Sequence, residues 1–277
     1  MKDPKRLEVL EKIKRYEKEG RFNEEVEENP PYKSLKPEDV DYLNKKWFHR
    51  INTAIANKIA KQYIEKLIKK QKLIIKQVTG IEKLDSIQTG FMLTCNHFNP
   101  YDNFALHITL ASYLHRNKKR FYKVIREGNY SFKGLYGYFF RNCNTLPLSS
   151  NMSTMIEFTK AIETILKRND VILIYPEQAM WWNYPKPRPL KTGAFKYAYK
   201  NNVPVVPCFI TMKDTNYIGE DGFYIKEYSL HFLDPIYPNL TLNQKDGIKS
   251  LCEKNEMAWK KVYEEVYQKP LAYDEVD

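Results

Sequence analysis

The chain has 277 residues, of which 43% are hydrophobic and 14% aromatic, and its formal net charge is +11. This composition excludes the low-complexity classes, and no apolar run approaches the roughly 20 residues that cross a bilayer. The four cysteines lack short metal-type spacing, and Cys95 and Cys208 lie in apolar, strand-like runs, as core thiols do, so we do not expect a disulfide framework. The positive charge favours an anionic partner: a phospholipid surface, an acidic carrier protein or nucleic acid.

Residues 1–40 are predicted to form a charged lead and a proline-rich linker. The first 28 residues mix acidic and basic side chains, and three prolines lie in the stretch ENPPYKSLKPEDV that follows. Proline interrupts helices, so we expect a linker or a wrap-around loop here. Because the lead is charged throughout and contains no signal-peptide core, we expect a cytoplasmic protein.

Residues 41–78 are predicted to form a basic amphipathic helical element. Residues 45–76 contain ten Lys or Arg and a single acid, Glu65, and apolar residues recur there at every fourth position. Two interpretations stay open: a helix packed on its own domain with a solvated basic back, or a helix lying in a lipid interface. The residues expected to bind the membrane are Trp47, Phe48, Lys58, Lys61, Lys66 and Lys69.

Residues 79–270 are predicted to form an α/β domain with a largely parallel central sheet flanked by helices. Short β-rich runs are expected at 91–95, 121–125, 171–175, 203–210 and 228–236. Helical patterns alternate with them at about 104–117, 131–140, 151–168, 191–201 and 242–268. Such alternation favours a parallel sheet, in which ligands bind beyond the carboxyl ends of the strands.

Two of the expected strands lead directly into acid–base residues. The run FMLTC precedes Asn96 and His97, with Asp102 five positions after the histidine, and VILIY precedes Glu177. Imidazole accepts a proton near neutral pH, and a hydrogen-bonded carboxylate fixes its tautomer. No G-x-S-x-G elbow is present, so a His97–Asp102 dyad that activates the substrate's own hydroxyl is predicted, and Cys95 is interpreted as a buried thiol. From the spacing alone, a hydrogen-bonded loop histidine remains the alternative.

Two later stretches contain candidates for binding an anionic group. In GLYGYFFRNCNTLPL, Gly137 and Arg141 flank an aromatic run, so the guanidinium could clamp a phosphate or form a structural salt bridge. In YPEQAMWWNYPKPRPLKTGA, the tryptophan pair is predicted to line a pocket. The basic residues of that loop are Lys186, Arg188 and Lys191.

The order of these motifs resembles the lysophosphatidic acid acyltransferase family of glycerolipid acyltransferases. Its first block, N-H-x-x-x-x-D, is matched by Asn96, His97 and Asp102, its second by Gly137 and Arg141, and its fourth by residues 203–207. The third block, Phe/Tyr-Pro-Glu-Gly-Thr-Arg, is matched only through Tyr175, Pro176 and Glu177. Gln178, Ala179 and Met180 stand where the family has Gly-Thr-Arg.

The resemblance implies transfer of a fatty acyl group from acyl-CoA or acyl carrier protein to the hydroxyl of lysophosphatidic acid, giving phosphatidic acid in phospholipid biosynthesis. His97 would be the general base and Asp102 would orient it. Asn96, Gly137, Arg141 and Glu177 would bind the substrate, and Arg188, Lys186 or Lys191 would supply the basic group missing from the third block.

The resemblance also implies a helical element that docks on anionic phospholipid at the inner face of the cell membrane, and we expect no metal and no bound cofactor. Backbone amides near the His97 loop are expected to stabilise the oxyanion.

Three alternatives stay open at this point. The acceptor could be another hydroxyl or an amine, since the third block is altered. The chain could be a hydrolase, or a non-catalytic protein whose basic face binds anionic lipid. Nucleic-acid binding is not expected, because the basic residues are interleaved with an aliphatic stripe rather than with exposed aromatic residues.

Overall fold

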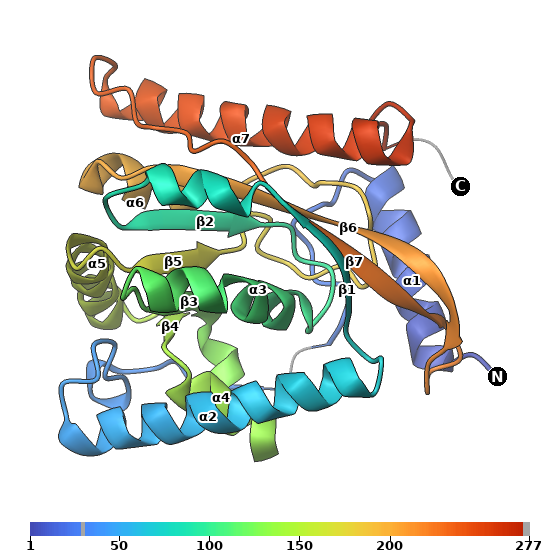
Figure 1. Ribbon diagram of the computed structural model, residues 1–277, viewed down its shortest axis with the longest axis horizontal. Coiled ribbons are helices and arrows are strands. Elements are labelled where there is room, and N and C mark those ends of the chain that lie inside the picture. Colours follow the sequence, from blue (N-terminus) through green and yellow to red (C-terminus); the bar gives the residue numbers. More distant parts are fainter. Residues whose placement is uncertain (29–30, 274–277) are drawn as a thin grey trace.

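The computed structural model describes residues 1–28 and 31–273, so Asn29 and Pro30 of the predicted linker lie outside the described residues. The chain forms a seven-stranded sheet in the order β1-β7-β6-β2-β5-β3-β4, with helices on both faces (Figure 1). The strand pairs are parallel except β6–β7. The predicted α/β fold with a largely parallel sheet is thus confirmed.

The strands are β1 (Ile74–Thr79), β2 (Phe91–Cys95), β3 (Phe121–Arg126), β4 (Thr145–Leu148), β5 (Val171–Ile174), β6 (Val205–Ile218) and β7 (Tyr224–Phe232). The α-helices are α1 (Pro4–Lys18), α2 (Trp47–Lys69), α3 (Asp102–Arg116), α4 (Gly134–Asn142), α5 (Met152–Lys167), α6 (Gly193–Asn201) and α7 (Gln244–Tyr267). Short 3-10 turns are η1 (Pro37–Asp39), η2 (Ile81–Ser86) and η3 (Glu127–Ser131).

The two faces of the sheet bury separate cores. Every residue of β2 and β5 is buried, as expected for central parallel strands. Because side chains alternate along a strand, Phe91 and Leu93 of β2 pack with α2 and α3, whereas Met92 packs with α5, α6 and α7. Because β2, β5 and β3 are neighbouring parallel strands, their carboxyl ends lie side by side at one end of the strands.

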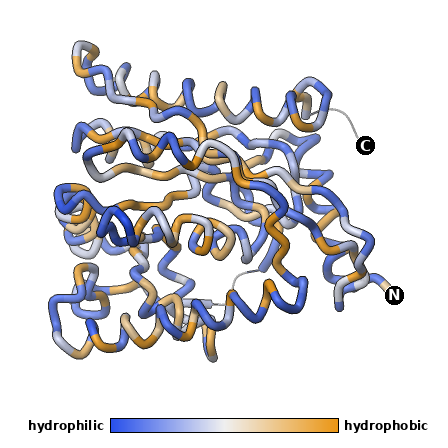
Figure 2. Tube along the Cα trace, viewed as in Figure 1, coloured by the Kyte–Doolittle hydropathy of each residue, from blue (hydrophilic) through white to orange (hydrophobic). Residues whose placement is uncertain are grey.

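The basic helical element is shorter than predicted. Helix α2 ends at Lys69, and residues 74–79 form β1, an edge strand parallel to β7, so the end of the predicted element 41–78 belongs to the sheet. The second half of α2 buries Ile64 and Leu67 in the core, whereas Trp47 and Ile51 of its first half are exposed. Polar and apolar segments alternate along the helix (Figure 2). No helix within the described residues is long and apolar enough to span a bilayer.

The tryptophan pair does not line a pocket, so that prediction is wrong. Trp181 is 0% exposed and donates its Nε1 to the carbonyl oxygen of Glu24, at 2.9 Å. Trp182 is 5% exposed and packs edge-on against Phe223. Residues 1–28 cover both indoles, since Glu24 contacts Trp181 and Arg6 lies over the ring of Trp182. The two rings are therefore buried within the chain itself and do not need a ligand or a membrane to cover them.

Candidate active site

His97 and Asp102 meet beyond the carboxyl end of β2. The strand ends at Cys95 and α3 begins at Asp102, and the turn between them brings Nδ1 of His97 to 2.7 Å from Oδ2 of Asp102. The Asp102 side chain is 0% exposed, whereas the imidazole is 23% exposed. With Nδ1–H donated to the carboxylate, Nε2 of His97 keeps its lone pair and can accept a proton.

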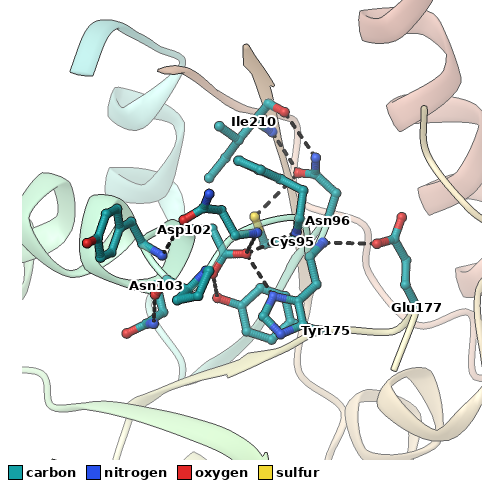
Figure 3. A network of polar contacts seen from close by, with 12 residues as sticks. Cys95, Asn96, Asp102, Asn103, Tyr175, Glu177 and Ile210 are labelled. Atoms are coloured by element: carbon teal, nitrogen blue, oxygen red, sulfur yellow. Dashed lines mark hydrogen bonds and ion pairs between the residues drawn. The ribbon is translucent and has the colours of Figure 1, made fainter. Parts of the chain in front are cut away.

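Four hydrogen-bond donors fix the Asp102 carboxylate. Besides His97, Oδ2 accepts the backbone N–H groups of Phe98, at 3.2 Å, and Asn99, at 3.4 Å. Oδ1 accepts the hydroxyl of Tyr175 at 2.7 Å, a contact drawn in Figure 3. Since the carboxylate also lies in the first turn of α3, the helix dipole favours its negative charge.

Tyr175, which matches the third block in the sequence, also belongs to the site. Its ring stacks on the imidazole of His97, with 4.0 Å between the centroids. Burial and the nearby Asp102 charge raise the pKa of Tyr175 well above its ordinary value, so its hydroxyl stays a donor. The available signal was its place at the end of β5, directly beside β2.

Glu177 and Arg188 hold the backbone on both sides of His97. Oε2 of Glu177 accepts the His97 backbone N–H at 2.9 Å and Nη2 of Arg188 at 2.9 Å, and Oε1 accepts the Arg188 backbone N–H at 2.8 Å. Arg188 also donates to the carbonyl oxygens of His97 and Ala179. The two side chains are only 1% and 2% exposed. The contacts of Glu177 and Arg188 hold the His97 loop in position. Direct contact of either side chain with a substrate stays a prediction.

Asn96 is fully engaged within the sheet. Its amide Nδ2 donates to the carbonyl oxygen of Ile210 at 3.0 Å, and its Oδ1 accepts the Ile210 N–H at 2.8 Å (Figure 3). These two hydrogen bonds to Ile210 of β6 fix the point at which β2 ends and the His97 loop begins. Cys95 is 0% exposed, and burial raises the pKa of its thiol well above the ordinary value, which agrees with the interpretation as a buried thiol.

Lys186 and Lys191, the other two cations of the loop 175–194, differ in exposure. Lys186 is 6% exposed and pairs with Glu17 of α1 at 2.8 Å. Lys191 is partly exposed at the end of the loop, where its backbone N–H donates to the carbonyl oxygen of Pro176 at 2.8 Å. Only Lys191 of these two presents its charge outward.

The second block lies on α4. Gly137 allows a close backbone approach, because a Cβ there would lie 1.8 Å from the carbonyl oxygen of Phe132. Arg141 is exposed, and its Nη1 donates to the carbonyl oxygens of Tyr130, at 2.7 Å, and Phe132, at 3.0 Å. Helix α4 packs against α2. Within the described residues no hydrogen bond or ion pair joins Arg141 to the imidazole.

The nearest backbone amides are already used. The N–H groups of His97, Phe98 and Asn99 donate to Glu177 or Asp102, so the expected oxyanion donor is not among these three. Across residues 1–28 and 31–273, no three His, Cys, Asp or Glu side chains cluster closely enough to hold a metal ion.

Two comparisons with known proteins found similarities to acyltransferases. Residues 76–211, just under half of the chain, match the family model described as Acyltransferase. Among solved structures the chain is similar to the 1-acyl-sn-glycerophosphate (LPA) acyltransferase PlsC from Thermotoga maritima, with 18% identity and a TM-score of 0.52, over 83% of this chain and 87% of that one. That likeness concerns the fold. A search of curated proteins found no match.

Proposed function

We propose that this chain, whose residues 76–211 match the Acyltransferase family model, moves a fatty acyl group from acyl-CoA or acyl carrier protein to the hydroxyl of lysophosphatidic acid. The observation that supports this most directly is the imidazole of His97, fixed through Nδ1 by a buried carboxylate and partly exposed. The acyltransferase name of the similar PlsC structure guides the choice of acceptor.

In the proposed reaction, Nε2 of His97 takes the proton of the acceptor hydroxyl as the oxygen attacks the thioester carbonyl carbon. The tetrahedral oxyanion then collapses, the C–S bond breaks, and the leaving thiolate takes the proton from His97. Asp102 stabilises the imidazolium, and Tyr175 keeps Asp102 in place. No acyl-enzyme forms on Cys95, because that thiol is buried. The reaction as written needs no metal and no bound cofactor.

The substrate contacts belong to the same proposal. Arg141 and Lys191, both reaching solvent, would hold the acceptor head group, and Gly137 would keep α4 close to the turn that Arg141 caps. Asn96, Glu177 and Arg188 are buried, so they would act by positioning the His97 loop.

A second candidate is transfer to a different hydroxyl or to an amine. It is favoured by one observation: Arg188 and Lys186, two of the three cations expected to replace the arginine of the third block, are buried and paired with acids. A phosphate could not reach either one without breaking an ion pair.

The proposed function is tested by thiol release from an acyl thioester, with and without lysophosphatidic acid, on anionic liposomes. We expect release that depends on the acceptor and yields phosphatidic acid. Release at the same rate without any acceptor would identify a hydrolase instead. Release only with monoacylglycerol or an amine would favour the second candidate.

We also propose that α2 docks the protein peripherally on anionic phospholipid, at the inner face of the cell membrane. On the first half of the helix, Trp47 is 71% exposed, Phe48 42%, Ile51 49% and Ile55 47%, so these four side chains form an exposed apolar face. The proposed basic contacts, all exposed, are Lys58, Lys61, Lys66 and Lys69. Apolar residues next to lysines are typical of interfacial helices. The excess of positive charge would equally suit an acidic carrier protein as donor.

Replacing Trp47 and Ile51 together by Ser is expected to weaken binding to phosphatidylglycerol liposomes at least about tenfold, since each buried apolar side chain contributes roughly 1.5–3 kcal/mol. Cosedimentation measures the effect. Met257→Ser is the matched control, because Met257 is 61% exposed on α7, which covers the opposite face of the sheet. Equal loss in the control, or no loss in the double variant, would contradict docking through α2.

A further inference from the structure

Residues 181–183, here called the clamp, lie along the His97 loop and pair with its backbone. The N–H of Trp181 donates to the carbonyl oxygen of His97 at 3.2 Å, and the N–H of Asn183 donates to the carbonyl oxygen of Phe98 at 2.8 Å. In the sequence the clamp directly follows the three residues that stand where the third block has Gly-Thr-Arg. The altered part of the third block is therefore in direct contact with the loop that carries the imidazole.

The conformation of Asn183 directs its side chain to the same loop. Asn183 has a φ of 52°, and the N–H of Tyr184 closes a turn around it by donating to the carbonyl oxygen of Trp181 at 3.1 Å. Asparagine adopts this left-handed conformation more readily than most residues other than glycine. The Oδ1 of Asn183 accepts Nδ2 of Asn99 at 3.2 Å. The clamp thus holds the His97 loop through its backbone and through this amide.

Asn99 connects the clamp to the Asp102 carboxylate. Its Oδ1 accepts the N–H of Tyr101 at 3.0 Å, and its own N–H donates to Oδ2 of Asp102 at 3.4 Å. The same Oδ2 lies 2.7 Å from Nδ1 of His97. The Asn183 amide therefore holds the side chain that shapes the turn between the two residues of the dyad.

The two tryptophans anchor the clamp in the protein. The guanidinium of Arg188 lies 4.9 Å from the ring centroid of Trp181. The ring of Trp182 contacts Phe223 edge-on at 5.0 Å, and the guanidinium of Arg6 lies 4.7 Å from its centroid. Because tightly packed interiors leave large side chains little freedom, the buried indoles restrict the backbone between them and Asn183. The tryptophan pair thus fixes the clamp against the loop.

We propose that Asn183 is a positioning residue for the reaction: its amide oxygen orients Asn99, and through Asn99 the turn that brings Asp102 to the imidazole of His97. The inference rests on the proposed function, in which this imidazole is the general base. In this role the altered third block orients the base and does not hold the acceptor's phosphate. Since proton transfer needs close alignment, a small displacement of the imidazole lowers the rate steeply.

The kinetic test uses the full chain with Asn183→Gly. Glycine keeps the left-handed conformation and the backbone N–H but removes the amide. We expect kcat to fall roughly 10–100-fold with the KM of donor and acceptor unchanged, because Asn183 acts through Asn99 and not on a substrate. Asn183→Asp should restore most of the rate, since a carboxylate oxygen also accepts Nδ2 of Asn99. A wild-type kcat in Asn183→Gly, or a raised KM at unchanged kcat, would overturn the proposal.

Two further variants test the connection. Asn99→Ala should lower kcat at least as much as Asn183→Gly, and the double variant should lose no more than Asn99→Ala alone. Losses that multiply would mean that the two amides act independently, which would overturn the proposal. Asn202→Gly is the matched control and should keep the full kcat. Asn202 is also left-handed, with a φ of 48°, but it follows α6 at the amino end of β6, opposite the end at which the His97 loop lies.

A spectroscopic measurement separates this inference from the proposed function. In protein labelled with ¹⁵N-histidine, at a pH where the imidazole is neutral, the ring nitrogen shifts report which nitrogen carries the proton. We expect the Nδ1–H form of His97 in the wild type and in Asn183→Asp, and a mixture of both forms in Asn183→Gly. His49 is the internal control and should not change, because its Nδ1 lies 2.9 Å from Oδ2 of Asp41 at a distance from the clamp.

An unchanged proton position on His97 in Asn183→Gly would overturn the inference, even if kcat fell. If the wild type transfers no acyl group to any acceptor, the proposed function fails. The nitrogen shifts then still decide whether Asn183 holds the imidazole.

Discussion

Replacing His97 by Ala is expected to lower acceptor-dependent thiol release by roughly 10³–10⁴-fold, because general-base assistance and orientation of the hydroxyl are lost together. Asp102→Asn should lose nearly as much, since an amide no longer holds the tautomer that leaves Nε2 free. Tyr175→Phe removes only the donor to Oδ1 and should cost roughly tenfold. The measurement is the rate at saturating donor and acceptor.

His115→Ala is the matched control for this series. His115 is exposed in the last turn of α3, whereas Asp102 lies at the first residue of the same helix. It should keep the full rate. Melting temperatures of the variants separate chemistry from unfolding, and His97→Ala should melt close to the wild type, because the imidazole is partly exposed and its loop is held by other bonds. Wild-type rates in His97→Ala would contradict the dyad.

The sequence predicted the central strands well because they are uniformly apolar. β2 and β5 are buried on both faces, and they appear as the runs FMLTC and VILI. The two strands it missed, β1 and β4, are the edges of the sheet. β1 contains the exposed Lys76 and Gln77, and β4 contains Pro147, a residue that edge strands tolerate. A strand that is paired on one side only is more exposed to solvent, so its sequence shows a weaker hydrophobic pattern.

The candidate site was predictable where it depended on local spacing, and not where it depended on distant segments. Asp102 reaches His97 because a short turn joins β2 to α3. In contrast, Arg188 is covered by a segment about 166 residues earlier in the chain, in which the carbonyl oxygen of Phe22 accepts a hydrogen bond from the guanidinium. Local patterns contain no information about such a contact, so a loop rich in tryptophan and cations was interpreted as a pocket wall.

Arg188→Met is the variant expected to affect stability most. It leaves the Glu177 carboxylate buried without its cation and also removes the donor to Phe22. Breaking a buried ion pair on one side costs about 3–5 kcal/mol, or roughly 10 °C in Tm for a chain of this size. The double variant Glu177→Gln/Arg188→Met removes both charges and should recover part of this loss. Thermal and denaturant unfolding measure both variants.

The same variant separates two roles for Arg188. If the guanidinium positions the His97 loop, Arg188→Met lowers Tm and kcat together, because the backbone that carries the imidazole loses the Glu177 contact at 2.9 Å. If it binds the acceptor phosphate instead, the KM rises while Tm stays near the wild-type value. Lys191→Met is the control for stability, since Lys191 is partly exposed on the same loop. A Tm unchanged in Arg188→Met would mean that the pair does not hold the loop, and the phosphate role would then be the better one.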